Sequence, residues 1–478
     1  DGWTATFDRT DYTGVMVDPA YPLAAWPDMA FIDGAARRQV ASRAEVVPGT
    51  FFVDYAGSKL YIGDNPAGRT VEASARGEAL YVNNSPNSVV RGIGFRHYAT
   101  PVARMGAVKG YADGVVFENN VFTQNALNGL SVIGANAKVV HNTMTDNGQL
   151  GFHAYKSTGL IVDGNLVRGN NYERFTPGQS AGGMKIGTSR DVLVTGNTVD
   201  SNHAKGIWID VSAWNVTLVH NLVRRNTSSG LMFEISANAV IADNVVTDNG
   251  DNGIYILESS DAQVWNNTAM RNRRDIQVLE GNRTSTADPA ITHDVDRVTV
   301  RNNVLSDGTS SSPSLFGVDD VRKQESGANM GVTTNYNAYH RTSSSSPQWI
   351  ANWSNWPSNM VASTTMGDFR SRTGQELNTL VADGTTTNPF VANEATGDYG
   401  LPTTSVARGK GQPLPSRIAA AIGVAPGTAV DMGVLTFGAQ APAPAPSLGP
   451  APAPTGLTAA AISSSRINLE WQASSGAS

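Results

Sequence analysis

Apolar runs that end at an asparagine recur along the middle of this chain. The Asn falls at eight positions, in steps of 22, 23, 32, 24, 23, 23 and 36 residues: Asn120, Asn142, Asn165, Asn197, Asn221, Asn244, Asn267 and Asn303. In seven repeats a second Asn follows five residues later, at Asn125, Asn147, Asn170, Asn202, Asn226, Asn249 and Asn272. A Gly stands four residues further on in five repeats, at Gly129, Gly151, Gly206, Gly230 and Gly253. Such registration predicts one structural unit per period.

The period indicates a parallel β-solenoid, in which each repeat forms one coil of short strands and turns. Neighbouring coils stack along the axis at the inter-strand spacing of ~4.8 Å. Equivalent residues then lie above one another, so inward Asn side chains can hydrogen-bond along the axis and satisfy backbone groups of the turns. The Asn columns are therefore predicted to be structural, and the fold class is predicted to be all-β.

The strand that follows each Gly has a second regularity. Its first and third residues are apolar in every repeat, so strand alternation predicts that the second and fourth residues point outward. The second-position column runs Ser131, His153, Lys185, Trp208, Met232, Tyr255 and Gln277, and the fourth-position column runs Ile133, Tyr155, Gly187, Asp210, Glu234, Leu257 and Leu279. Glu258 lies just past the fourth position. This concentration of charged and aromatic residues predicts a functional face.

Two carboxylates occupy equivalent places on adjacent coils of this face. Asp210 and Glu234 should have Cβ atoms ~5 Å apart, so both cannot ionise easily and one pKa should rise. A raised acid beside an ionised partner is the pair that glycoside hydrolysis requires. Glu258 is a third catalytic candidate. The aromatic rings of Trp208 and Tyr255 are predicted to stack on sugars.

Other polar residues of the face are predicted to contact the substrate. His153, Tyr155 and Lys185 lie on the two outward columns. An insertion, residues 171–181, delays the Gly of one repeat and falls beside the richest coils. Long insertions in solenoids usually map to a binding face, so Tyr172, Glu173 and Arg174 are predicted to wall a cleft.

The same residues also permit a different reaction. A lyase or epimerase removes the proton next to a uronate carboxyl group, and needs a base together with a cation that neutralises that carboxylate. The candidates for these roles are Lys185, His153, Tyr155 and Arg174. In that reaction Asp210, Glu234 and Glu258 would hold Ca²⁺, which prefers oxygen ligands. Hydrolysis, by contrast, is expected to require no metal or other cofactor. The third alternative is a protein that binds a glycan without catalysis.

The repeats quoted above resemble the right-handed parallel β-helix family of secreted bacterial carbohydrate-active enzymes, the pectate-lyase-like superfamily. The resemblance covers residues 79–305 and implies an all-β, right-handed parallel β-helix, a polysaccharide substrate and a secreted protein. It leaves the reaction open because one fold hosts many chemistries. The tripeptides NTD and GHG that polygalacturonases display do not occur, which disfavours that subfamily.

The flanking segments lack the repeat. Residues 1–78 are predicted to form a β-rich cap over the solenoid end, and residues 306–440 to form an irregular capping flank. Residues 441–455 alternate Ala and Pro and predict a stiff, extended linker. Residues 456–478 resemble the start of a fibronectin type III module, with the strand pattern of Leu457, Ile467, Leu469 and Trp471.

Composition excludes several classes of protein. The 478 residues carry 35 Lys and Arg against 41 Asp and Glu, a net charge of −6, whereas a nucleic-acid-binding protein would be basic. There is no Cys, so disulfides, thiol nucleophiles and zinc–thiolate sites are absent. No apolar run approaches the ~18 residues of a membrane span. Neither nucleic acid nor a membrane is therefore an expected partner. The outward face and the resemblance predict a polysaccharide partner, and a monomer is the default expectation.

Overall fold

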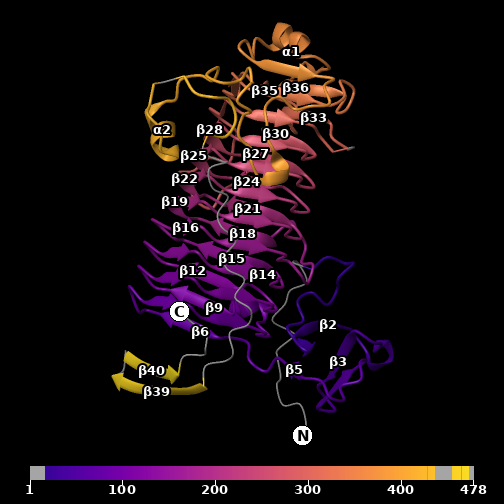
Figure 1. The fold of residues 1–478 in the computed structure, drawn as a ribbon, viewed down its shortest axis with the longest axis vertical. Coiled ribbons are helices and arrows are strands. Elements are labelled where there is room, and N and C mark those ends of the chain that lie inside the picture. The colour runs from indigo at the N-terminus through magenta and orange to yellow at the C-terminus, as the bar shows by residue number, and fades with distance from the viewer. Residues whose placement is uncertain (1–16, 310, 428, 436–454, 464–465, 473–478) are drawn as a thin grey trace.

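The computed structural model describes residues 17–309, 311–427, 429–435, 455–463 and 466–472. Within them, three long sheets run side by side along the long axis of the molecule (Figure 1). Each coil contributes one strand to each sheet in turn, and the strands of neighbouring coils pair in parallel. We call these sheets A, B and C in the order in which the chain enters them.

Sheet A has 12 strands: β6 (Leu80–Asn83), β9 (Val108–Tyr111), β12 (Leu130–Ile133), β15 (Leu150–Tyr155), β18 (Gly182–Gly187), β21 (Lys205–Asp210), β24 (Leu231–Glu234), β27 (Asn252–Leu257), β30 (Arg274–Glu280), β33 (Ser314–Asp320), β36 (Trp349–Asn355) and β37 (Asn359–Ser363). Only its last pair, β36 and β37, is antiparallel.

Sheet B has ten strands: β7 (Val89–Arg91), β10 (Val116–Glu118), β13 (Lys138–Val140), β16 (Ile161–Asp163), β19 (Arg190–Thr195), β22 (Trp214–Val219), β25 (Ala237–Ala242), β28 (Ser260–Trp265), β31 (Thr299–Arg301) and β34 (Thr333–Asn335). Sheet C has 11 strands: β8 (Gly94–Arg96), β11 (Val121–Thr123), β14 (Thr143–Thr145), β17 (Leu166–Arg168), β20 (Thr198–Asp200), β23 (Leu222–Arg224), β26 (Val245–Thr247), β29 (Thr268–Met270), β32 (Val304–Ser306), β35 (Ala338–Arg341) and β38 (Leu380–Asp383).

The Asn columns form the two predicted ladders. In each ladder the side-chain amide of one Asn donates to the side-chain carbonyl of the next, for example at 3.0 Å from Asn197 to Asn221. The first ladder continues to Asn337, whose amide donates to the buried Glu376 at 2.7 Å. The second ends at Asp275, which accepts from the Asn272 amide at 3.0 Å. The Asn side chains therefore satisfy one another, as the sequence predicts. Their amides also donate to carbonyls of strand residues, such as Val162 and Val194.

The inward residues of all three sheets fill one continuous apolar core. On sheet A, the first and third residues after each Gly are fully buried in it, as in Ile207 and Ile209 of β21 or Ile254 and Ile256 of β27. The predicted phase of these strands is confirmed.

The coils continue beyond residue 305, where the sequence was expected to become irregular. β33, β36 and β38 add further parallel strands to sheets A and C. The segment that contains Trp349 and Trp353 is strand β36, and Trp353 packs in the core. These coils lack the Gly and the second Asn of the repeat, so the sequence pattern does not predict them. Asn337 nevertheless continues the first ladder in register.

Smaller elements pack around the solenoid. The N-terminal segment packs beside the coils, since Ala25 clusters with Leu127 and Phe175, and Phe31 clusters with Ala126. The N-terminal segment forms a five-stranded sheet from β1 (Ala30–Ile32), β2 (Ala35–Gln39), β3 (Thr50–Asp54), β4 (Lys59–Ile62) and β5 (Val71–Ala73). The helices are α1 (Met366–Thr373) and α2 (Ser416–Ile422), with 3₁₀ turns η2 (Arg43–Glu45), η3 (Val102–Arg104) and η4 (Glu394–Thr396). No helix in the described part of the chain is both long and apolar enough to span a membrane.

After Asp383 the chain packs back along the solenoid. Helix α2 buries Ile418 and Ile422 against Trp265 on the outer face of sheet B. Phe390 and Met432 pack with Val245 on the outer face of sheet C. We call the described residues 386–427 and 429–435 the strap; its packing clusters lie on sheets B and C.

The last described strands, β39 (Thr455–Ser463) and β40 (Arg466–Gln472), pair with each other antiparallel. This pair lies within the segment predicted to begin a fibronectin type III module. The predicted linker lies outside the described residues except for its last position.

Candidate functional site

The outer face of sheet A brings the two predicted columns together in the expected register. Lys185 pairs with Trp208 across β18 and β21, and Gly187 pairs with Asp210. One coil further on, Met232 pairs with Tyr255 across β24 and β27. Because these residues are absent from the interior cluster while their strand neighbours fill it, the columns do face away from the core.

The three candidate acids are nevertheless covered. Asp210, Glu234 and Glu258 are only 4%, 5% and 4% exposed, so the expectation that the two paired acids face open solvent is wrong. The physical reason is that two insertions fold over this face and place cations or backbone carbonyls on it. They are residues 171–181, before β18, and residues 281–297, after β30.

Asp210 is paired with Lys185. The ammonium nitrogen lies 2.8 Å from Oδ2 of Asp210 and 3.7 Å from the ring centre of Trp208. It also donates to the backbone carbonyl of Gln179, in the first insertion, at 2.5 Å. Lys185 thus holds Asp210 as an ion pair beneath the insertion, and its own side chain is 15% exposed.

Glu234 accepts two hydrogen bonds. The indole nitrogen of Trp208 donates to Oε2 at 2.8 Å, and Nη2 of Arg283 lies 2.8 Å from Oε1. Burial raises the pKa of Glu234, and the negative charge of Asp210 raises it further, while the Arg283 and Trp208 donors oppose the rise. Glu234 and Asp210 are therefore placed in different electrostatic environments although they occupy equivalent positions.

Arg283, from the second insertion, bridges two of the acids. Its Nε lies 2.6 Å from Oε2 of Glu258, and its backbone N–H donates to the other oxygen of Glu258 at 2.9 Å. Its side chain remains 46% exposed, so Arg283 is the outermost group above Glu234. Sequence reasoning missed this residue. The signal was the 36-residue step from Asn267 to Asn303, which marks an insertion as clearly as the 32-residue step does.

Lys205 is a second residue that sequence reasoning missed. Its ammonium nitrogen lies 4.0 Å from the Trp208 ring centre and donates to the backbone carbonyl of Pro177 at 2.6 Å. Burial lowers the pKa of Lys205 to about 8, although the nearby Glu234 charge works in the other direction. Lys205 stands one residue before Gly206. The predicted outward columns contain only residues that follow each Gly, so they do not include this position.

The lysines also correct the role expected for Trp208. Both ammonium groups lie over its ring and the residue is 3% exposed, so this indole is not an open stacking surface for sugars. It orients Glu234 through its N–H instead. Tyr255 is half-buried on the neighbouring coil, and burial raises the pKa of its hydroxyl.

His153 and Tyr155 lie toward the N-terminal side of the acids. His153 is 9% exposed, and its Nδ1 lies 3.2 Å from the Ser131 hydroxyl. Burial, together with the Lys185 charge, lowers the pKa of His153 to about 4, so its ring is neutral at pH 7. Tyr155 is 37% exposed. A methyl group at Gly187 would lie 3.5 Å from Cδ2 of Tyr155, so the ring leans toward the coil of Asp210.

The predicted wall residues lie elsewhere on the first insertion. The backbone amides of Tyr172 and Glu173 donate to the carbonyls of Asn147 and Gly148, in the turn before β15, and Tyr172 is 46% exposed. The Arg174 amide bonds locally to the Asn171 carbonyl. The insertion instead reaches the face through the carbonyls of Pro177 and Gln179, because these satisfy the two buried lysines.

Burial also raises the pKa of Glu173 to about 7. This carboxyl lies beside Gly148, at the turn before β15. Its protonation is therefore separate from that of the pair Asp210 and Glu234.

The candidate Ca²⁺ ligands, all in the described part of the chain, do not form a cluster of metal-binding side chains. Across the described ranges, His, Asp and Glu side chains form no group of three or more that could hold an ion. The three acids that a Ca²⁺ site would use are already paired with Lys185 and Arg283.

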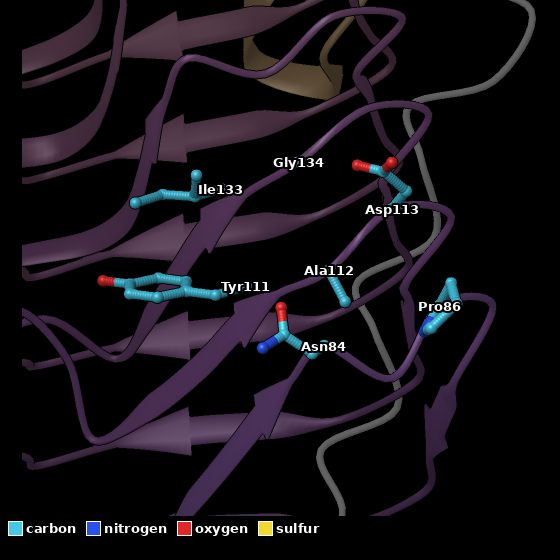
Figure 2. A pocket seen from close by; sticks show the side chains of 7 residues that line it. All are labelled: Asn84, Pro86, Tyr111, Ala112, Asp113, Ile133 and Gly134. Atoms are coloured by element: carbon cyan, nitrogen blue, oxygen red, sulfur yellow. The ribbon is translucent and has the colours of Figure 1, made fainter.

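One pocket lies on the same side of the molecule, toward the N-terminal coils. It has a volume of about 420 Å³ and is lined by Asn84, Pro86, Tyr111, Ala112, Asp113, Ile133 and Gly134. In Figure 2 the Tyr111 and Ile133 side chains extend in the same direction from adjacent strands, and Asn84 lies beneath them. The pocket is thus formed by the ends of β6, β9 and β12 and the turns that follow.

Two family models match the chain. The model described as a right-handed beta helix region covers residues 78–227, and the model described as periplasmic copper-binding protein (NosD) covers residues 171–306. A search of curated proteins finds no match. The chain has no Cys, and within the described ranges His, Asp and Glu form no group of three or more that could hold a copper ion.

Solved structures with similar folds include XylC in complex with xylose, at 13% identity and a TM-score of 0.53, over 77% of this chain and 68% of that chain. The A-module of mannuronan C-5 epimerase AlgE4 from Azotobacter vinelandii matches at 14% identity and 0.40, over 54% and 70%. An alginate lyase from Paenibacillus sp. str. FPU-7 matches at 12% and 0.39, over 56% and 93%. With the parallel sheets and the right-handed model, the XylC likeness identifies this chain as a right-handed parallel β-helix protein.

Proposed function

We propose that this protein is an extracellular or periplasmic glycoside hydrolase that cleaves a polysaccharide on the outer face of sheet A. The observation that carries the proposal is the divergent environment of two acids on adjacent coils. Asp210 is paired with an ammonium group, whereas burial and the Asp210 charge raise the pKa of Glu234. Titratable neighbours whose environments differ in this way are the usual acid and partner of glycoside hydrolysis.

In the proposed reaction Glu234 donates its proton to the glycosidic oxygen as the bond from that oxygen to the anomeric carbon breaks. Asp210 is the carboxylate partner, which either attacks this carbon or takes a proton from the attacking water, and water supplies the hydroxyl of the new reducing end. Lys185 forms an ion pair with Asp210, and the Trp208 indole orients Glu234. Both acids retain a small exposed fraction, 4% and 5%. Sugar can reach them where the half-exposed Arg283 now lies, so substrate binding must shift this side chain or use it as a hydroxyl-binding donor.

The fold and its relatives supply separate support for the substrate class and the location. XylC, which shares the fold, was determined with xylose, a sugar. The NosD family model describes a periplasmic protein, in keeping with a location outside the cytoplasm.

Amide substitutions at the two acids test the proposal. We expect Glu234→Gln and Asp210→Asn each to lower kcat by at least about 10²-fold, the contribution of a positioned acid or base. The measurement is release of reducing ends from xylan, mannan, β-glucan, polygalacturonate and alginate. Glu118→Gln, a carboxylate on sheet B paired with Arg91, is the matched control. Near-normal turnover in both acid variants would remove the assignment.

A lyase or epimerase acting on a uronate polymer is the second candidate. The observation that favours it is the exposure of Lys185, a potential base. Its side chain is 15% exposed, whereas that of Asp210 is 6% exposed. This reaction would release ultraviolet-absorbing unsaturated products or invert a sugar, whereas hydrolysis releases saturated reducing ends. Product analysis of the wild-type digest separates the two reactions.

A further inference from the structure

We propose that the N-terminal coils of sheet A carry a separate sugar-binding site that holds a distant part of the polysaccharide chain. It consists of Tyr81, Lys109 and Tyr111 with the pocket of Figure 2. The inference rests on the proposed function and deepens it, because it specifies a substrate that is a long polymer rather than a short oligosaccharide.

An aromatic pair forms the first part of this site. The rings of Tyr81 and Tyr111 lie edge to face, with their centres 5.4 Å apart, and Tyr81 is 42% exposed. Lys109 lies 4.0 Å from the Tyr81 ring centre and 2.5 Å from a carboxylate oxygen of Glu78. The pair is therefore held rigid by its neighbours and still presents ring surface to solvent, as stacking on a sugar requires.

The pocket supplies the second part. Tyr111 and Ile133 contribute apolar surface, while Asn84 and Asp113 contribute amide and carboxylate groups that can bond to sugar hydroxyls. Asp113 is fixed in place because it accepts a hydrogen bond from the backbone N–H of Ala135 at 2.7 Å. The lining thus mixes apolar and polar surface, and sugars present both hydroxyl groups and apolar ring faces.

Continuity of the face links this site to the acids. Tyr111 pairs with Ile133 on the next coil, and Tyr155 pairs with Gly187, which in turn pairs with Asp210. The coil of Tyr111 is four inter-strand steps from the coil of Asp210, or ~19 Å at the usual spacing. The partly exposed Tyr155 lies between them on the same outer face. One extended glycan chain can therefore contact the pocket and the acids together.

The test is affinity electrophoresis in gels that contain xylan, mannan, β-glucan, polygalacturonate or alginate. The parent for binding is Glu234→Gln, so that the polymer stays intact. We expect Tyr111→Ala and Tyr81→Ala to weaken retardation by at least one polymer about tenfold in Kd, since each removes tens of Å² of apolar contact. Tyr111→Phe keeps the ring and should bind like the parent. Tyr21→Ala, an exposed tyrosine outside the solenoid, is the control.

Unchanged retardation in both Ala variants overturns the inference, and so does a parent protein that no polymer retards. A loss equally large in Tyr111→Phe overturns stacking and assigns the effect to the hydroxyl, which lies 3.4 Å from Ser131. Circular dichroism checks that each variant is folded. Because retardation needs no turnover, failure of this site is distinguishable from failure of the hydrolase proposal, which appears as undiminished cleavage by Glu234→Gln.

Discussion

Buried acids in this protein differ in what surrounds them, and this difference separates a structural role from a chemical one. Asp275 is fully buried and accepts from the amide of Asn272 and from the backbone N–H of Ser306, so it closes an Asn ladder. Glu376 is also fully buried and accepts from Asn337 at the end of the other ladder. Glu234 instead accepts from an indole and from a half-exposed guanidinium. Of these three acids, only Glu234 keeps any exposed surface.

His153 predicts how stability depends on pH. Its pKa is about 4 in the folded state and 6.5 as an ordinary value, so between these the unfolded chain binds a proton that the folded chain does not. The stability that neutral His153 contributes is therefore present above about pH 6.5 and is lost as the pH falls toward 4. We expect His153→Gln to flatten the pH dependence of urea denaturation across this window. His141→Gln, at an exposed histidine, should not, and equal slopes in both variants would contradict the prediction.

At the scale of elements, the Asn ladders connect each coil to the next. Asn197 accepts from the backbone N–H and the side-chain amide of Asn165, both at 2.9 Å. It donates to Asn221 at 3.0 Å and to the carbonyl of Val162 in β16 at 3.0 Å. Removing one member therefore leaves buried donors and acceptors without partners on two coils.

We expect Asn197→Ala to lower the free energy of unfolding by about 3 kcal/mol, since each unsatisfied buried group costs about 1–3 kcal/mol. Denaturant titration measures the loss. Asn378→Ala, at an exposed asparagine, should change it by less than about 0.5 kcal/mol. A loss no larger at Asn197 than at Asn378 would show that the ladder does not stabilise the coils.

The insertion of residues 281–297 is the element that tunes the acid pair. Arg283 opposes the rise in the pKa of Glu234. Without this cation the pKa of Glu234 rises further, so Glu234 stays protonated to higher pH. For Arg283→Met we expect the alkaline limb of the pH–kcat profile to move upward in pH, measured on the polysaccharide that is cleaved. Arg91→Met, which removes an exposed ion pair on sheet B, is the control. An unmoved limb would contradict the role of Glu234 as the acid.

At the scale of the whole molecule, the strap lies along two of the three outer faces. It packs on the outer faces of sheets B and C through clusters around Trp265 and Met432. It is also fastened by backbone groups, such as the carbonyl of Asp431, which accepts from Asn266 at 2.8 Å. Among the described residues, neither cluster includes a residue of sheet A, whose outer face carries the two insertions.

The strap should open without unfolding the coils, because its contacts are with the outside of the sheets. We expect Ile418→Asp to place a charge against Trp265 and to increase hydrogen exchange within residues 386–435, while the sheet strands of β15 to β27 stay protected. Ala420→Asp, on the exposed side of α2, is the matched control. Loss of protection throughout sheet A would show instead that the strap is part of one cooperative unit.

The sequence by itself determined the coil period, the inward and outward phase of sheet A and the Asn ladders. All three are repeated local patterns, and stacking them needs no information beyond their spacing. It also placed Asp210 and Glu234 on adjacent coils. Only the tertiary structure decided what covers them, since Arg283 reaches Glu234 from 49 residues away. An insertion does not follow the repeat, so its spacing in the sequence does not predict where it lies. Its position depends on the buried charges with which it forms contacts, and only the folded chain brings these charges together.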